Sequence, residues 1–128
     1  MKLEKKPPIL VEAVYTQSWV SGVEGGGSGT NLFIETTDRN IVLDSVYFRN
    51  SKVKLETKPS DDTLYIGRFG SNVYPKQSEG VENFPFQLEN DECVVSYNEN
   101  GTTKYFKFTG IKERPTETLP MTPLPNNN

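Results

Sequence analysis

Residues 93–108 read CVVSYNENGTTKYFKF and predict a β-hairpin closed by Asn100 and Gly101. A two-residue type I′ turn needs positive φ at both central positions, and Asn followed by Gly accepts that conformation with little strain. Pairing outward from the turn places three residue pairs on one largely apolar face: Tyr97 with Lys104, Val95 with Phe106, and Cys93 with Phe108. The hairpin therefore predicts two strands with one buried face, on which the single cysteine is a small core residue and not a reactive thiol.

The rest of the chain shows similar short runs. Aromatic and β-branched residues recur between Gly, Pro, Asn and Asp, which indicates many short strands. The predicted strands cover residues 12–20, 31–37, 41–49, 52–58, 63–69, 84–89, 92–98 and 102–112. Charged residues alternate with apolar or small residues along 52–58, which predicts a strand with one solvent-exposed face and one buried face. Residues 12–20 are also compatible with a helix, because Val11, Tyr15 and Trp19 recur at helical spacing.

These strands predict one all-β domain. A chain of 128 residues is long enough for one core and too short for two ordinary domains. About seven or eight strands within residues 9–113 favour an antiparallel two-sheet β-sandwich, immunoglobulin-like or related, with a partly open barrel as the alternative. Residues 1–8 predict a flexible N-terminal segment, and residues 114–128, rich in proline and asparagine, predict a disordered tail that cannot join a sheet.

The composition argues against several functions. The chain has no histidine and one cysteine, so most familiar catalytic triads and transition-metal sites cannot form, and we predict no metal, cofactor or catalytic residue. Lys and Arg total 14 against 17 Asp and Glu, which leaves no excess of cations for a phosphate backbone. Nucleic acid is not an expected partner. No apolar run approaches the roughly 20 residues that cross a bilayer, so no membrane-spanning segment is expected.

The candidate binding segment is a glycine-rich loop. Residues 19–31 read WVSGVEGGGSGTN, which allows positive φ and close approach of the backbone to a ligand. The amides of Gly25, Gly26 and Gly27, followed by Ser28, are candidates for holding an oxyanion, although the P-loop and dinucleotide patterns are both missing. The competing interpretation is a flexible hairpin connection between two strands.

Five side chains outside the glycines are further candidates. Trp19, at the mouth of the loop, is a candidate stacking platform for a sugar or another ligand, with a core tryptophan as the alternative. Arg68 lies among aromatic residues in the sequence and is a candidate for a binding face. The alternative is that Arg68 is an exposed strand residue whose aliphatic part covers an aromatic ring. Asp61, Asp62 and Glu92 are candidate carboxylates for acid/base hydrolysis, with solvated turns as the alternative.

Four segments carry a resemblance. Residues 15–29 (YTQSWVSGVEGGGSG), 41–48 (IVLDSVYF), 85–88 (PFQL) and the hairpin of 97–108 resemble small lipoprotein-like proteins of Bacteroidota, chiefly flavobacteria. The similarity covers most of residues 8–112 and implies a single domain of the cell envelope or periplasm, without supplying a catalytic residue. Many members of that group look like lipoproteins, with a leader and a lipid-modified cysteine ahead of this body. This chain as given begins MKLEKKPP, without the pattern of an export signal, so the cytoplasm is the alternative location.

The leading hypothesis is a non-enzymatic β-sandwich that binds a protein or small ligand, or supports structure, in the bacterial cell envelope. Binding would use the glycine-rich loop and nearby aromatic side chains. The alternatives are a small carboxylate-based hydrolase and a purely structural assembly subunit that pairs with a neighbour through an edge strand.

Overall fold

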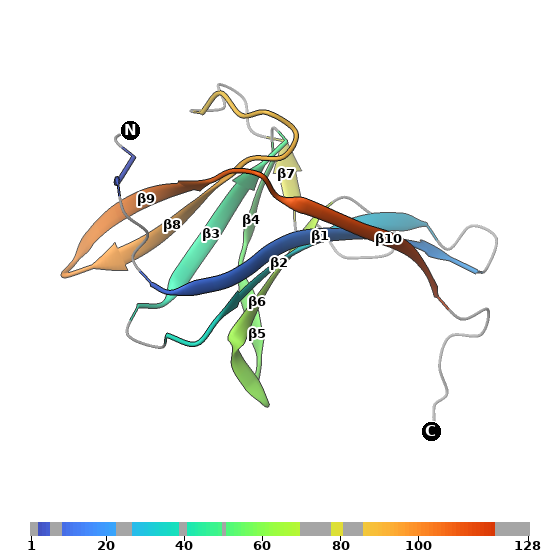
Figure 1. Ribbon diagram of the computed structural model, residues 1–128, viewed down its shortest axis with the longest axis horizontal. Coiled ribbons are helices and arrows are strands. Elements are labelled where there is room, and N and C mark those ends of the chain that lie inside the picture. The colour runs from blue at the N-terminus through green and yellow to red at the C-terminus, as the bar shows by residue number, and fades with distance from the viewer. Residues whose placement is uncertain are drawn as a thin grey trace.

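The computed structural model describes residues 3–5, 9–22, 27–38, 41–49, 51–69, 78–80 and 86–119. Ten strands within these residues form two sheets of five strands, which confirms the predicted all-β sandwich (Figure 1). Residues 12–20 belong to a strand and not to a helix. Within the described ranges, no helix is long and apolar enough to cross a membrane.

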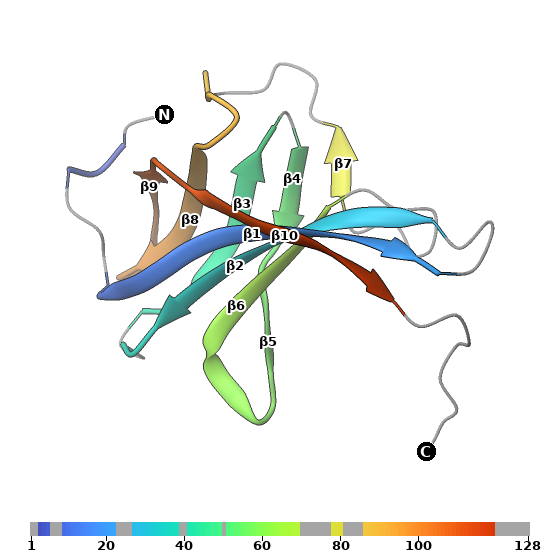
Figure 2. The same ribbon diagram turned by 45° about the vertical axis from the view of Figure 1, so that its right-hand side comes forward.

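The first sheet, called the β1 sheet, has the order β10-β1-β2-β6-β5. Its strands are β10 (Lys112–Leu119), β1 (Val11–Ser21), β2 (Ser28–Thr36), β6 (Asp61–Phe69) and β5 (Glu56–Lys58). The second, called the β3 sheet, has the order β7-β4-β3-β8-β9. Its strands are β7 (Ser78–Gly80), β4 (Ser51–Lys54), β3 (Leu43–Phe48), β8 (Cys93–Glu99) and β9 (Thr102–Phe108). The long strands β1, β2 and β10 run past the β3 sheet on one side (Figure 2).

The β8–β9 hairpin has the predicted turn and register. Asn100 and Gly101 have φ values of 53° and 81°, and the side-chain oxygen of Asn98 accepts a hydrogen bond from the Gly101 amide at 3.1 Å. All three predicted residue pairs occur in the ladder. Cys93 is fully buried, as predicted, and its burial raises the pKa of the thiol to about 12.

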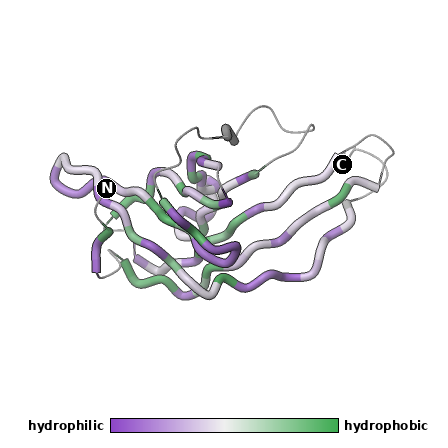
Figure 3. The backbone as a smooth tube through the Cα atoms, turned by 90° about the horizontal axis from the view of Figure 1, so that it is seen from above, coloured by the Kyte–Doolittle hydropathy of each residue, from purple (hydrophilic) through white to green (hydrophobic). Residues whose placement is uncertain are grey.

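The two sheets approach closely at Gly67 in the middle of β6. A Cβ atom there would lie 2.9 Å from Val46 Cγ1 and 3.1 Å from Val53 Cγ2, which belong to β3 and β4 of the opposing sheet. The rings of Phe48 and Phe69 meet edge to face across the same interface, with centroids 5.4 Å apart. Hydrophobic and hydrophilic residues alternate along the strands, as a sandwich with one inward face per sheet requires (Figure 3).

Residues 52–58, predicted as one strand, form two strands that belong to different sheets. β4 pairs with β3 and β5 pairs with β6, and the chain changes sheets at Leu55. The Leu55 amide donates to the Asp44 carbonyl at 2.9 Å, and the Leu55 side chain is buried. This crossover makes a corner between the two sheets.

The prediction that residues 114–128 cannot join a sheet is wrong for Arg114 to Leu119, which lie in β10. This strand pairs in parallel with β1 at the edge of its sheet, so the predicted antiparallel sandwich contains one parallel pair. Between Gln17 and Trp19, β1 advances by two residues while β10 advances by three, so Pro115 lies in a bulge. An edge strand and a bulge both tolerate proline, and Gln17 Nε2 donates to the Pro115 carbonyl at 3.0 Å. Residues 120–128 lie outside the described part.

Two other predicted segments differ from the structure. Residues 86–89 are not a strand, because Phe86 packs on the outer face of the β3 sheet, 5.0 Å from the Tyr47 ring and 5.6 Å from the Tyr105 ring. The described part of the N-terminal segment, predicted to be flexible, contacts β9: Leu3 forms a parallel bridge with Tyr105, and the Glu4 amide donates to the Tyr105 carbonyl at 2.8 Å. Residues 84–85, 1–2 and 6–8 lie outside the described ranges.

Candidate functional site

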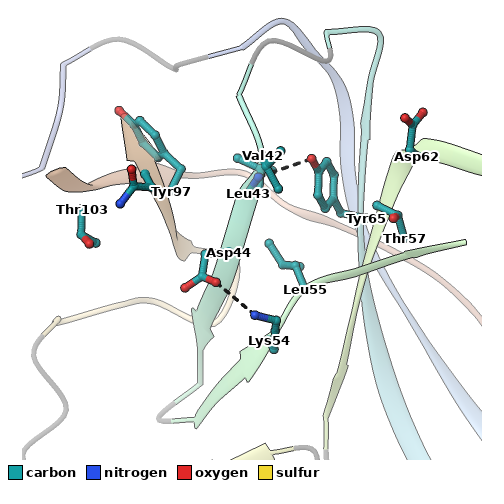
Figure 4. A pocket seen from close by; sticks show the side chains of 11 residues that line it. Val42, Leu43, Asp44, Lys54, Leu55, Thr57, Asp62, Tyr65, Tyr97 and Thr103 are labelled. Carbon is teal, nitrogen blue, oxygen red and sulfur yellow. Dashed lines mark hydrogen bonds and ion pairs between the residues drawn. The ribbon is translucent and has the colours of Figure 1, made fainter. Parts of the chain in front are cut away.

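A pocket of about 520 Å³, called the end pocket, lies beneath the corner that Leu55 makes between the sheets (Figure 4). It is close to the start of β3 and the end of β8. Six strands and two connecting residues contribute side chains, all within the described part of the chain: Val42, Leu43, Asp44, Lys54, Leu55, Thr57, Asp62, Tyr65, Tyr97, Asn98 and Thr103.

The floor of the end pocket is apolar and buried. Leu43, Leu55, Tyr65 and Tyr97 are each exposed by 5% or less. Val42 stands at the rim with 72% of its surface exposed, an apolar side chain in water beside an apolar floor. A ligand that covered Val42 would bury apolar area and gain the hydrophobic contribution of about 25 cal/mol per Å².

Two tyrosines line the end pocket, and their hydroxyl groups differ in direction: that of Tyr65 points toward Leu43, and that of Tyr97 points away from it (Figure 4). The Tyr65 hydroxyl oxygen accepts the Leu43 amide at 3.3 Å, and its own hydrogen has no acceptor among the described residues. The Tyr97 hydroxyl makes no hydrogen bond to the described part of the protein. Burial raises the pKa of Tyr97, and the negative charges of Glu4 and Glu99 add to the effect, so the hydroxyl keeps its proton.

The rim carries charges of both signs. Lys54 Nζ lies 3.4 Å from Asp44 Oδ1, and both side chains are more than half exposed. Asp62 enters from β6, in the opposite sheet, so the lining holds two carboxylates and one ammonium group. Asn98, whose side-chain oxygen already accepts the Gly101 amide, has its amide NH₂ as a donor. Tyr97 and Thr103 lie to one side of Leu43, and Tyr65, Thr57 and Asp62 to the other (Figure 4).

The end pocket has the size and composition of a small-ligand site. Such sites measure about 300–1,000 Å³ and combine an apolar lining with a few polar groups that fix orientation. Strand patterns could have found Leu43 and Tyr97 as inward-facing residues. They could not have found the pocket, because its walls come from residues up to 61 positions apart, Val42 to Thr103, which only sheet pairing brings together.

The structure brings two of the predicted site residues together. Trp19 and Ser28 line a second pocket of about 460 Å³, beside Arg49 and Thr116. Only 3% of Trp19 is exposed, so the indole offers no open stacking face and the buried alternative holds. Arg49, in the lining of this pocket, already has partners within the protein. Its Nη2 lies 3.6 Å from Glu113 Oε1, and its Nε donates to the Asn90 carbonyl at 3.2 Å.

The remaining predicted binding residues are dispersed. Gly25 and Gly26 lie outside the described residues. Gly27 has a φ of 86°, and its carbonyl accepts the Ser21 amide at 2.9 Å, which is the geometry of a hairpin connection. Arg68 lies opposite Asn31, one residue before the end of β6. Because its neighbour Gly67 faces the opposing sheet, Arg68 faces outward and lines neither pocket.

The three predicted carboxylates do not gather at one site. Asp61 accepts hydrogen bonds from the Thr63 amide and hydroxyl, as in an ordinary turn, and Asp62 lines the end pocket. Glu92 precedes β8 at the end of that strand away from Tyr97, roughly 17 Å along it. The Glu89 amide donates to Glu92 and Lys107 lies 3.3 Å away; both lower the pKa of this carboxyl, opposite to what a general acid needs.

Nothing in the described ranges gathers three side chains of the kind that hold a metal ion. No family model matches the sequence, and neither curated proteins nor solved structures give a significant match to the chain. The resemblance to lipoprotein-like proteins of Bacteroidota therefore stays a prediction, and the candidate site rests on its own geometry.

Proposed function

We propose that this chain is a non-enzymatic binding domain that captures a small ligand in the end pocket. The observation that carries the proposal is a buried apolar floor, which includes Leu43 and Leu55, with the exposed apolar side chain of Val42 at its rim and polar side chains from both sheets around it. A ligand that covered Val42 and the floor would remove apolar area from water, which contributes about 25 cal/mol per Å². The proposed binding site is therefore the end pocket and not the predicted glycine-rich loop.

The location in the bacterial cell envelope is part of the proposal and rests on the resemblance of residues 15–29, 41–48, 85–88 and 97–108. A binding domain without catalysis fits that location, since envelope proteins meet ligands outside the cell. Fractionation of cells that express the natural reading frame would test it: recovery with the envelope supports the location, and recovery in the cytosol contradicts it.

The test of ligand capture uses two probes that combine an apolar body with a hydroxyl group, phenol and 2-propanol. Titration into ¹⁵N-labelled protein should shift the amide resonances of Leu43, Leu55 and Tyr97 together along one saturable curve. Shifts that are absent there, or that scatter over the surface without saturation, would contradict a site in the end pocket.

A matched pair of variants sharpens this test. Val42 and Leu10 are both 72% exposed, but only Val42 lines the end pocket. Val42→Ser should weaken phenol binding by about two- to five-fold, because it removes apolar area that phenol would cover. Leu10→Ser should leave the titration unchanged, and an equal effect of both variants would indicate nonspecific adsorption.

The carboxylate-based hydrolase remains as a second candidate because Asp44 and Asp62 line the same pocket from opposite sheets. Acid/base glycosidases use two carboxyl groups that flank the bond to be cleaved. Asp44 is paired with Lys54, which favours a structural role for it. Release of nitrophenol from 4-nitrophenyl glycosides, abolished by Asp62→Asn, would favour the hydrolase over the binding domain.

A further inference from the structure

We infer that the outer edge of β9 is a surface for pairing with a second copy of this chain, and that residues 3–5 of the same copy cover this edge. The described N-terminal residues lie beside β9 (Figure 1). The inference does not depend on ligand capture in the end pocket.

The first step compares the strands at the edges of the two sheets, which among the described strands are β5, β7, β9 and β10. β5 and β7 have three residues each, which is too short for extended pairing with another chain. β10 reads KERPTETL, so charged residues and Pro115 interrupt its edge. β9 reads TTKYFKF, which is rich in aromatic and β-branched residues and has no proline. β9 is therefore the edge strand best suited to pairing.

The second step concerns the two lysines of β9, because lysine on an edge strand often opposes pairing with another chain. Lys104 Nζ lies 2.7 Å from Glu99 Oε1, and Lys107 Nζ lies 3.3 Å from Glu92 Oε1. Glu99 belongs to β8, and Glu92 directly precedes it. Both ammonium groups are thus neutralised on the β8 side, and neither protects the outer edge of β9.

The third step concerns the backbone of that edge. Leu3 forms a parallel bridge with Tyr105, and the Glu4 amide donates to the Tyr105 carbonyl at 2.8 Å. The backbone groups of Tyr105 therefore point away from β8. Because backbone direction alternates along a strand, the amides and carbonyls of Thr103 and Lys107 point to the same side. The edge thus accepts an extended segment, and residues 3–5 occupy its middle.

The fourth step concerns the partner. An antiparallel pair of two β9 strands centred on Tyr105 would place Thr103 of each copy opposite Lys107 of the other, and would use the edge-facing groups of all three residues. Lys104 and Lys107 lie on opposite faces of the sheet, so this register sets no two lysines opposite each other. The pair has a two-fold axis, which closes it as a dimer. A second copy and Glu4 need the same place at Tyr105, so the two pairings exclude each other.

The experiment measures the molar mass of the full-length protein and its variants by light scattering. The unaltered chain should be a monomer. Glu4→Pro removes the amide that donates to Tyr105 and should therefore dimerise. One strand from each copy buries less than the roughly 1,000 Å² of a stable complex, so we expect a Kd of about 0.1–1 mM. Deletion of residues 1–5 should give the same dimer.

Two control variants separate backbone pairing from other effects. Glu4→Gln removes the charge but keeps the backbone amide, so it should stay monomeric. Adding Thr103→Pro to Glu4→Pro removes an amide of the outer edge and leaves the ladder with β8 in place, so this double variant should also be monomeric.

Amide hydrogen exchange locates the contact. In concentrated Glu4→Pro protein the amides of Thr103 and Lys107 should exchange about five-fold more slowly than in dilute protein. Glu4→Pro protein that stays monomeric at about 1 mM, or that dimerises without slower exchange at these amides, would overturn the inference. An unaltered chain that dimerises as readily as Glu4→Pro would also overturn it, since residues 3–5 would then not cover the edge.

Discussion

Replacing Gly67 by alanine tests how closely the two sheets pack. The added methyl carbon would lie 2.9 Å from Val46 Cγ1 and 3.1 Å from Val53 Cγ2, against the 3.5–4.0 Å or so at which carbon atoms attract most strongly. Both valines are buried, with 2% exposure or less, so neither can turn into solvent. Overpacking of this kind lowers the free energy of unfolding by about 1–3 kcal/mol. Alanine also has less backbone freedom than glycine in the unfolded chain, which offsets about 0.4–1 kcal/mol of that loss. The expected loss is about 1–2 kcal/mol.

Urea unfolding measures this loss, with the fluorescence of Trp19, the only tryptophan, as the signal. Gly67→Ala should lower the midpoint at an unchanged m value. Val46→Ala alone should cost about 2–3 kcal/mol, since it leaves a cavity. In the double variant the new methyl group fills part of that cavity, so the combined cost should fall short of the sum by at least about 1 kcal/mol. A Gly67→Ala protein as stable as the parent, or strictly additive costs, would refute the close approach of β6 to β3 and β4.

Three further predictions concern single residues. The buried Cys93 thiol, with its pKa raised to about 12, should not react with Ellman's reagent in the native protein and should react fully in urea; rapid native reaction would contradict its burial. The pKa of Glu92 is lowered in the folded state, so its contribution to stability is present above the ordinary value of 4.5 and is lost as pH falls through the folded value. Glu92→Gln should therefore lower the thermal midpoint near neutral pH, and the difference should vanish in acid; a difference independent of pH would count against this role. The Arg114 guanidinium lies 3.5 Å from the Tyr15 ring centroid, so Arg114→Gln should destabilise β10 docking by about 0.5–1 kcal/mol and speed amide exchange in β10 alone, whereas faster exchange throughout the sandwich would refute a local effect.

Local chemistry made part of the fold predictable. Asn100 and Gly101 determine the turn, the turn determines the register of β8 and β9, and the register places Cys93 in the core. These steps depend on neighbours in sequence, which a single chain displays directly. Similarly, the alternation in residues 52–58 correctly predicted extended backbone and the burial of Val53 and Leu55, but it missed the change of sheet at Leu55 and the exposure of all three residues of β5.

The missed features depend on contacts between distant residues. Pro115 argued against a strand, and only the parallel pairing with β1, the bulge and the Gln17 side chain make β10 possible. Phe86 is of a residue type that favours strands, but it lies in a loop and packs on Tyr47 and Tyr105. Composition alone cannot distinguish these outcomes, since the deciding partners lie elsewhere in the chain.

The candidate site was missed for the same reason. The glycine-rich loop is the predicted binding segment because its unusual composition is visible in the sequence itself. Tyr65 and Tyr97 look like ordinary strand tyrosines until the sheets bring both side chains to one pocket with Asp62. The spare hydroxyl hydrogen of Tyr65 is visible only once the Leu43 amide is seen to occupy its oxygen.

The most direct test of the central claim is a crystal structure of the protein soaked in phenol. We expect electron density for a phenol ring against Leu55 in the end pocket, with its hydroxyl group accepting a hydrogen bond from Tyr65. An end pocket closed by its own side chains, with phenol bound elsewhere or nowhere, would contradict the account.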